Sequence, residues 1–227
     1  MGDDFALTEP PRREDSPLTK LCKQREAFET PAWAARAILR VELMTRYVID
    51  PCCGLGALTE AARDLRHRVG TIDVEDWSQC FDGVRGPMLL MDWLAFARAD
   101  FEEFHLLLDM SKDDDFTVFM NPPFSNACDF VDQALRLGAR KVLCFQTAQW
   151  RTSKERRAWF ERNPPARVWT CGERATCWRF DDPRRVGGGS DTPTEHRWYV
   201  WERGHRGIEA NHMLWKDMAD ADQGVML

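Results

Sequence analysis

The stretch Tyr47-Val-Ile-Asp-Pro-Cys-Cys-Gly-Leu-Gly56 determines the fold that we expect for this chain. Its first four residues form a short apolar run typical of a buried strand, and its two glycines allow a tight turn directly afterwards. Residues 57–66 are strong helix formers, so the order is strand, glycine loop and helix. That order begins the βα units of nucleotide-binding folds.

Apolar runs and helical stretches alternate along the rest of the chain. We expect further strands at residues 69–73, 88–91, 116–120 and 141–145, and helices at 31–44, 57–66 and 127–137. Such alternation predicts a parallel sheet covered on both faces. Two aromatic and β-branched runs, at residues 167–170 and 196–202, predict a closing hairpin. The expected fold is therefore α/β and Rossmann-like, with a mostly parallel seven-stranded sheet and a C-terminal antiparallel hairpin.

The domain organisation follows from length and composition. The 227 residues suffice for one well-buried core and leave little for a second. Residues 1–24 are charged, rich in proline and without apolar periodicity, so we expect a flexible N-terminal arm, a folded domain over 25–206 and a tail over 207–227. No long apolar run or basic leader is present, which predicts a cytoplasmic location.

Cysteine and charge patterns restrict the function classes. The eight cysteines include no pair at zinc-ligand spacing, so we expect reduced thiols and no metal site. The net charge of −6 argues weakly against nucleic acid, yet residues 147–206 hold 13 basic and 8 acidic side chains. This basic segment fits a polyanion-binding face, and it equally fits a solvated helix with ion pairs.

Carboxylates lie at the ends of three expected strands. Asp50 ends the first, Asp73 ends the second and Asp92 ends the third. A carboxylate at the end of the second strand can bind ribose hydroxyls, and the next can accept a hydrogen bond from an exocyclic amine. With the glycine loop, these residues predict a nucleoside pocket. The third glycine of a dinucleotide fingerprint is missing, which argues for a ligand other than NAD.

The loop Asn121-Pro-Pro-Phe124 follows the strand expected at residues 116–120. Neither Pro122 nor Pro123 can donate a ladder hydrogen bond, so the strand must end in a rigid loop. The Asn121 carboxamide oxygen and the Pro122 carbonyl can each accept a hydrogen from an amine, leaving its lone pair available for reaction. Phe124 can stack on a planar ring and fix its orientation.

These motifs resemble those of S-adenosylmethionine-dependent amino-methyltransferases: Asp50-x-x-x-Gly54-x-Gly56, Asp73, Asp92 and Asn121-Pro-Pro-Phe124, in this order. Glu29-Thr-Pro31 also resembles the N-terminal cofactor-contacting segment of the gamma-order DNA adenine methylases. The resemblance covers residues 25–206 and implies a class I methyltransferase domain with S-adenosylmethionine as cofactor. It further implies methyl transfer to the N6 amine of adenine in DNA, by a protein of phage or mobile-element type.

The resemblance also implies residue roles. Catalytic roles fall on Asn121, Pro122, Pro123 and Phe124. Thr30, Asp50, Gly54 and Gly56 would surround the methionine portion of the cofactor, Asp73 the ribose and Asp92 the adenine amine. The full cofactor-binding set is Thr30, Pro31, Asp50, Cys52, Gly54, Gly56, Asp73, Asp92 and Asn121, and Cys52 stands where the family pattern has alanine.

The substrate side is expected on two segments. Adenine in duplex DNA must flip out of the stack to reach the loop. Arg174-Ala-Thr-Cys-Trp178 resembles the R-P-S-F element of phage-borne adenine methylases, which implies that Trp178 closes the second face of the base; a core role is the alternative. We expect a basic helix over residues 151–157 to contact DNA phosphates, with the contact set Trp150, Arg151, Lys154, Arg156 and Arg157.

Several alternatives stay open. The Asn-Pro-Pro-aromatic loop also suits adenine in RNA or a protein glutamine, and a non-catalytic nucleic-acid-binding module is a further alternative. Cys52 and Cys53 could suggest a cytosine nucleophile, but they lie in the expected cofactor loop. No separate recognition domain is expected after residue 206, so base reading falls to residues 150–154 and 181–194. We therefore expect a short or relaxed sequence specificity.

Overall fold

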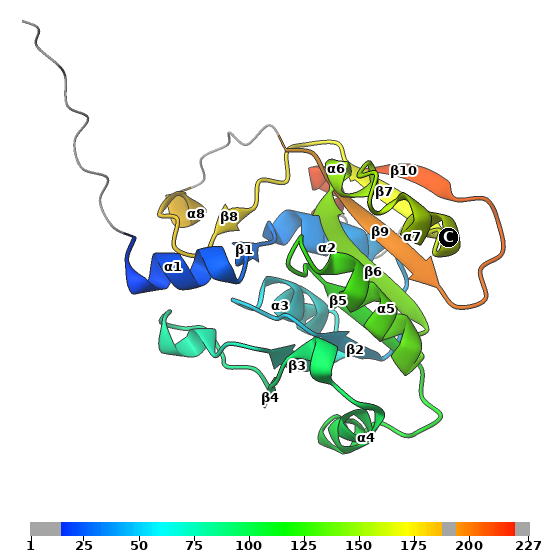
Figure 1. The fold of residues 1–227 in the computed structure, drawn as a ribbon, viewed down its shortest axis with the longest axis horizontal. Helices are drawn as coiled ribbons and strands as arrows, with labels where there is room; N and C mark the ends of the chain where they lie inside the picture. The colour runs from blue at the N-terminus through cyan, green and yellow to red at the C-terminus, as the bar shows by residue number, and fades with distance from the viewer. Residues whose placement is uncertain (1–14, 188–193, 221–227) are drawn as a thin grey trace, which may run out of the picture.

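The structure, a computed structural model, describes residues 15–187 and 194–220. Its centre is an eight-stranded sheet of order β10-β7-β9-β6-β5-β2-β3-β4 (Figure 1). The strands are β2 Tyr47–Asp50, β3 Arg68–Asp73, β4 Leu89–Leu90, β5 Phe116–Met120, β6 Lys141–Thr147, β7 Arg167–Cys171, β9 His196–Glu202 and β10 Ala210–Leu214. A separate two-stranded sheet pairs β1 Phe28–Glu29 with β8 Trp178–Arg179.

The strand directions confirm the expected Rossmann-like α/β fold. β4, β3, β2, β5 and β6 are mutually parallel, while β9 runs antiparallel to both β6 and β7. The order reverses at β2, which has β3 on one side and β5 on the other, so a topological switch point lies at their carboxyl ends. The sheet has eight strands rather than seven because β10 pairs in parallel with β7.

Successive side chains of a strand point to opposite faces of the sheet, and here both sets are apolar. Helices therefore cover both faces. Val48 and Phe119 face one layer, which contains α2 Ala32–Val41 and α3 Ala57–Asp64. Ile49, Val118 and Met120 face the other layer, which contains α4 Arg98–Leu107, α5 Ala127–Leu137 and α7 Arg157–Arg162. Shorter helices are α6 Ala148–Arg151, α8 Arg184–Gly187, η1 Trp77–Gln79, η2 Trp93–Ala95 and η3 Lys216–Ala219.

Three expectations about local structure are wrong. Within the expected arm, α1 spans Pro17–Gln24, begins at the cap residue Ser16 and buries Cys22. Residues 210–214 of the expected tail form β10. The expected basic helix over 151–157 is a connection, since α6 ends and α7 begins at those two residues. Residues 1–14 of the arm, 188–193 of the expected base-reading loop and 221–227 of the tail lie outside the described residues.

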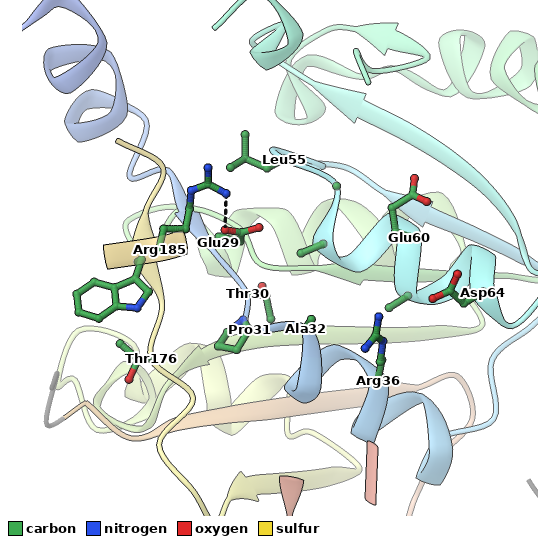
Figure 2. A pocket seen from close by; sticks show the side chains of 14 residues that line it. Glu29, Thr30, Pro31, Ala32, Arg36, Leu55, Glu60, Asp64, Thr176 and Arg185 are labelled. Carbon is green, nitrogen blue, oxygen red and sulfur yellow. Dashed lines mark hydrogen bonds and ion pairs between the residues drawn. The ribbon is translucent and has the colours of Figure 1, made fainter. Parts of the chain in front are cut away.

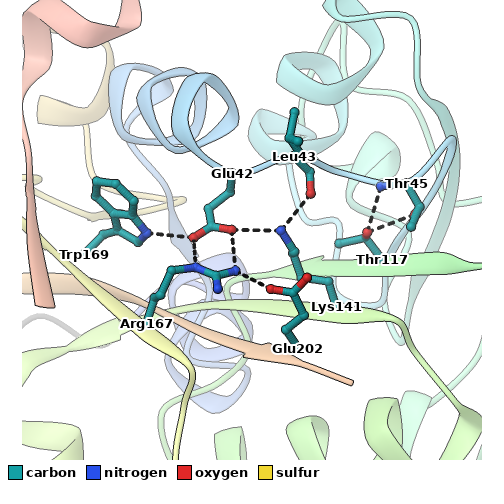
Figure 3. Close-up of polar contacts among 8 residues, drawn as sticks. All are labelled: Glu42, Leu43, Thr45, Thr117, Lys141, Arg167, Trp169 and Glu202. Carbon is teal, nitrogen blue, oxygen red and sulfur yellow. Dashed lines mark hydrogen bonds and ion pairs between the residues drawn. The ribbon is translucent and has the colours of Figure 1, made fainter. Parts of the chain in front are cut away.

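A buried ionic cluster lies at the start of β6 and β7, on the side of the sheet opposite the switch point (Figure 3). Glu42, 3% exposed, follows α2 and accepts two hydrogen bonds from Arg167 at 2.6 and 2.9 Å. It also accepts bonds from Lys141 at 2.9 Å and from the Trp169 indole at 2.8 Å. Burial opposes ionisation of Glu42, but these hydrogen bonds outweigh it and hold its pKa below the usual value. The cluster therefore ties α2 to β6 and β7.

We expect Glu42→Gln to lower the free energy of unfolding by about 3 to 5 kcal/mol, because the change leaves buried cations without their carboxylate. Urea denaturation measures the loss. The matched control is Glu161→Gln in the exposed Arg157–Glu161 pair, which should change stability little. Similar small losses in the two variants would contradict the anchoring role of Glu42.

Candidate functional site

A cavity of about 180 Å³ lies at the carboxyl ends of β2, β3, β4 and β5, beside the switch point. Ligands of open α/β sheets bind at this edge. Its walls include six of the residues predicted from sequence: Cys52, Gly54, Asp73, Asp92, Asn121 and Pro123. The structure therefore brings the glycine loop, two strand-end carboxylates and the Asn121–Phe124 loop together.

Asp73 holds the glycine loop in place. One carboxylate oxygen accepts the Gly54 backbone N–H at 2.8 Å, and the other accepts the Glu75 N–H at 3.0 Å. Gly54 and Gly56 both have left-handed backbone angles, with φ of 51° and 92°, which glycine adopts without strain. A Cβ on Gly54 would also lie 2.6 Å from the Phe180 ring, so the close approach of that ring requires glycine.

Asp50 is 1% exposed and accepts a hydrogen bond from the Thr59 hydroxyl at 2.9 Å. Its other carboxylate oxygen is buried and has no partner among the described residues. Burial raises the pKa of Asp50 to about 7, and the Thr59 hydrogen bond only partly opposes this shift. Asp50 is therefore a strand-end carboxyl that carries a proton at mildly acidic pH.

The N-terminal segment fixes the loop that follows β5. Asn121 donates a side-chain hydrogen bond to the Phe28 carbonyl at 3.1 Å, which leaves its Oδ1 as an acceptor with no partner among the described residues. The Phe28 and Phe124 rings lie 5.6 Å apart, tilted by 36°. Glu26 accepts hydrogen bonds from the Ser125 backbone and hydroxyl at 3.0 and 3.2 Å. The sequence analysis did not identify Glu26 and Phe28 as site residues. Their partners Ser125 and Asn121 lie 99 and 93 residues away, and no local sequence pattern indicates these contacts.

A second cavity, of about 450 Å³, lies where α2 and α3 begin (Figure 2). Thr30, Pro31 and Gly56 line this cavity rather than the first. Thr30 is 3% exposed, and its hydroxyl has no hydrogen-bond partner within residues 15–187 and 194–220. Arg185 pairs with Glu29 at 3.1 Å on the same wall. The predicted cofactor residues are thus divided between the two cavities, except Asp50, which is buried and lines neither.

Trp178, predicted to close the second face of the base, is not among the residues that line the first cavity. Trp178 lies in β8, not in the hairpin strand β7, and it lines the second cavity. The Arg184 guanidinium lies over its ring at 4.1 Å. The aromatic ring that faces Phe124 is Phe28. The β8 strand that holds Trp178 pairs with β1 in the separate two-stranded sheet.

The expected DNA-contact set is also largely engaged within the protein. Trp150 is 3% exposed and packs against Phe160 and Tyr199, so its predicted DNA contact is wrong. Arg151 pairs with Glu209 at 2.6 Å. Arg156 donates to the Trp150 carbonyl at 3.3 Å. Two members of the set remain at the surface: Lys154 is exposed, and Arg157 is exposed while paired with Glu161.

The cysteines do not provide a nucleophile at this edge. Burial, together with the nearby Asp50 charge, raises the pKa of the Cys52 and Cys53 thiols. A thiol with a raised pKa is a poor nucleophile, which disfavours cytosine chemistry. All eight cysteines are free thiols. Within the described ranges, no group of three or more potential metal ligands occurs.

The described part of the chain contains no helix with the length and apolar character needed to cross a bilayer.

Comparisons with known proteins identify distant structural likeness. No family model and no curated protein matches this chain. The structure is similar to that of 23S rRNA methyltransferase ErmE, with a TM-score of 0.48, 13% identity and coverage of 79% of this chain and 70% of that one. It is also similar to the plantazolicin methyltransferase BpumL in complex with monoazolic desmethylPZN analog and SAH, with a TM-score of 0.46, 11% identity and coverage of 82% and 89%.

We expect Asp50→Asn to stabilise the protein increasingly as pH rises. The pKa of Asp50 is raised from 3.8 to about 7 in the folded state, so the folded protein keeps a proton that the unfolded chain releases at lower pH. The stabilisation from this proton is complete below the unfolded-state pKa and is lost as pH rises through the folded-state pKa. Asn cannot ionise and keeps an acceptor for Thr59. The gain in unfolding free energy over wild type should grow by about 2 to 3 kcal/mol between about pH 5 and pH 8. A gain independent of pH in thermal unfolding would show that Asp50 does not titrate in this range.

Proposed function

We propose that this protein is an S-adenosylmethionine-dependent methyltransferase that methylates the N6 amine of adenine in DNA, with short or relaxed sequence specificity. The observation that carries the proposal is the Asn121 side chain. Its amide N–H is committed to the Phe28 carbonyl, so its Oδ1 is available to accept a substrate hydrogen in the cavity beside the glycine loop. In the order of motifs along the chain, this arrangement resembles that of amino-methyltransferases.

The residues of the two cavities fit the cofactor. S-adenosylmethionine, when bound, supplies an electrophilic methyl group on a sulfonium. In the first cavity, Asp92 accepts the Leu94 N–H with one oxygen and keeps the other for an amine. Asp73 retains lone pairs for ribose hydroxyls. In the second cavity, the free hydroxyl of Thr30 and the N-termini of α2 and α3 suit the carboxylate of an amino acid.

The side chain of Phe180 borders the first cavity and restricts its size. The Phe180 ring packs on Gly54 and against the Trp77 ring at 5.0 Å. It borders the first cavity, whose volume of about 180 Å³ is below the roughly 300 Å³ of common ligand pockets. We infer that displacement of Phe180 enlarges the first cavity for the nucleoside.

The chemistry of the target amine follows from the acceptors. An aromatic amine is a weak nucleophile because its lone pair is delocalised into the ring. Asn121 Oδ1 and the Pro122 carbonyl would each accept one amine hydrogen and so direct the lone pair away from the ring plane, toward the methyl donor. Bound S-adenosylmethionine would supply the methyl group and leave as S-adenosylhomocysteine, and the extra proton of the methylated amine would pass to water. Phe124 would stack on the base.

The substrate assignment is tested by offering labelled cofactor with duplex DNA, single-stranded DNA, RNA and glutamine-containing peptides. Label in the adenine of DNA is the expected result. Label confined to RNA or peptide would replace the proposed substrate with one of these alternatives. No transfer to any substrate, with cofactor binding intact, would favour the non-catalytic nucleic-acid-binding module.

Two variants should separate cofactor binding from transfer. We expect Asp92→Ala to weaken cofactor binding about 10-fold, since it removes a hydrogen-bond acceptor for the nucleoside. Asn121→Ala should reduce transfer at least about 100-fold with cofactor affinity nearly unchanged. Titration calorimetry and a transfer assay measure the two effects. Equal losses of cofactor affinity in the two variants would contradict these separate roles.

A further inference from the structure

We propose that Gln146 is a positioning residue for methyl transfer, because its buried side-chain amide holds the Pro122 carbonyl in the orientation that receives the target amine. This inference rests on the proposed function. Gln146 lies in β6, and no sequence motif marks it. Gln146 lines neither cavity, so its effect on the reaction passes through Pro122, a buried residue between Asn121 and Pro123, which both line the first cavity.

The register of the sheet explains why Gln146 meets Pro122. β5 and β6 are parallel, and Met120 pairs with Cys144. Two residues further along each strand, Pro122 stands beside Gln146. Prolines end the regular ladder because they lack an N–H donor. The Gln146 side chain continues the contact between the strands, with Nε2 donating to the Pro122 carbonyl at 2.9 Å.

The burial of Gln146 indicates that stability alone does not account for it. The side chain is 0% exposed, and its Oε1 is buried with no partner among the described residues. A buried unsatisfied acceptor costs about 1 to 3 kcal/mol, which an apolar side chain of similar length would avoid. The free-energy cost of the unsatisfied Oε1 offsets the gain from the hydrogen bond to Pro122, so Gln146 adds little net stability. An apolar residue could not donate a hydrogen bond to the Pro122 carbonyl, and we infer that this bond is the role of Gln146.

The hydrogen bond from Gln146 leaves the Pro122 carbonyl oxygen able to accept a second hydrogen bond. A carbonyl oxygen has two lone pairs, and Gln146 engages one of them. The second lone pair is then fixed in direction for an incoming amine hydrogen. The other proposed acceptor, Asn121, is fixed separately by the Phe28 carbonyl. Each acceptor thus has its own support, one from β6 and one from β1, and loss of either support should misplace only one of the two contacts.

The test compares Gln146→Met with wild type in cofactor affinity, thermal unfolding and single-turnover transfer to DNA. We expect kcat to fall about 10- to 100-fold, the range for a misplaced contact, while cofactor Kd and Tm stay near wild type. The matched control is Gln133→Met, since Gln133 is another buried glutamine that donates to a backbone carbonyl, that of Phe96. This control should keep its kcat.

A second variant, Gln146→Glu, provides a pH signature. A buried carboxyl has a raised pKa, and only its protonated form can donate to the Pro122 carbonyl. Its kcat should approach wild type at low pH and fall as pH rises, relative to wild type at each pH. A purely structural role would instead lower Tm without this selective dependence of kcat.

The outcomes separate this inference from the proposed function. An active wild-type protein with an unchanged kcat in Gln146→Met overturns the positioning role alone. A lower Tm in both Gln146 variants, without a fall in kcat beyond that of the Gln133 control, also overturns the positioning role. A wild-type protein that transfers no methyl group to any of the offered substrates removes the proposed function and this inference together.

Discussion

The end of β5 at two consecutive prolines is the constraint on which the site depends. Pro122 and Pro123 cannot donate to neighbouring strands, so the loop must be held by other bonds. Asn121 donates to the Phe28 carbonyl, the Ser125 backbone donates to Glu26, and Gln146 donates to the Pro122 carbonyl. Two segments far apart in the sequence, residues 26–28 and the end of β6, therefore hold this one loop.

The helix α2 lies between the second cavity and the ionic cluster around Glu42. Thr30 and Pro31, which directly precede this helix, line the second cavity, and Glu42 follows its last residue. Glu42 is tied to β6 and β7 by charge-assisted bonds. The ionic cluster at one edge of the sheet thus supports the orientation of residues at the opposite edge. Unsatisfied polar atoms occur near the proposed site, at Asp50 and Gln146, whereas the Glu42 carboxylate is fully paired.

The parts of the fold that sequence predicts are those with strong local signals. The apolar runs of β2, β5 and β6, the glycine loop and the two prolines determine their own backbone structure, and the expected sheet follows from their order. β10 could not be predicted, because Asn211, His212 and Met213 are exposed and the strand exists only by pairing with β7. Arg151 reads as a DNA contact until its partner Glu209, 58 residues away, is known. Phe28 and Gln146 are single residues whose roles arise from tertiary contacts alone.

We propose that methyl transfer to the amine of adenine in DNA depends on Asn121. The most direct measurement is nucleoside mass spectrometry of DNA from cells that express either the wild-type protein or Asn121→Ala. The account predicts N6-methyladenine at many sites with wild type and a background level with the variant. Unmodified adenine with wild-type protein that is folded and binds S-adenosylmethionine, or equal modification by the variant, would contradict it.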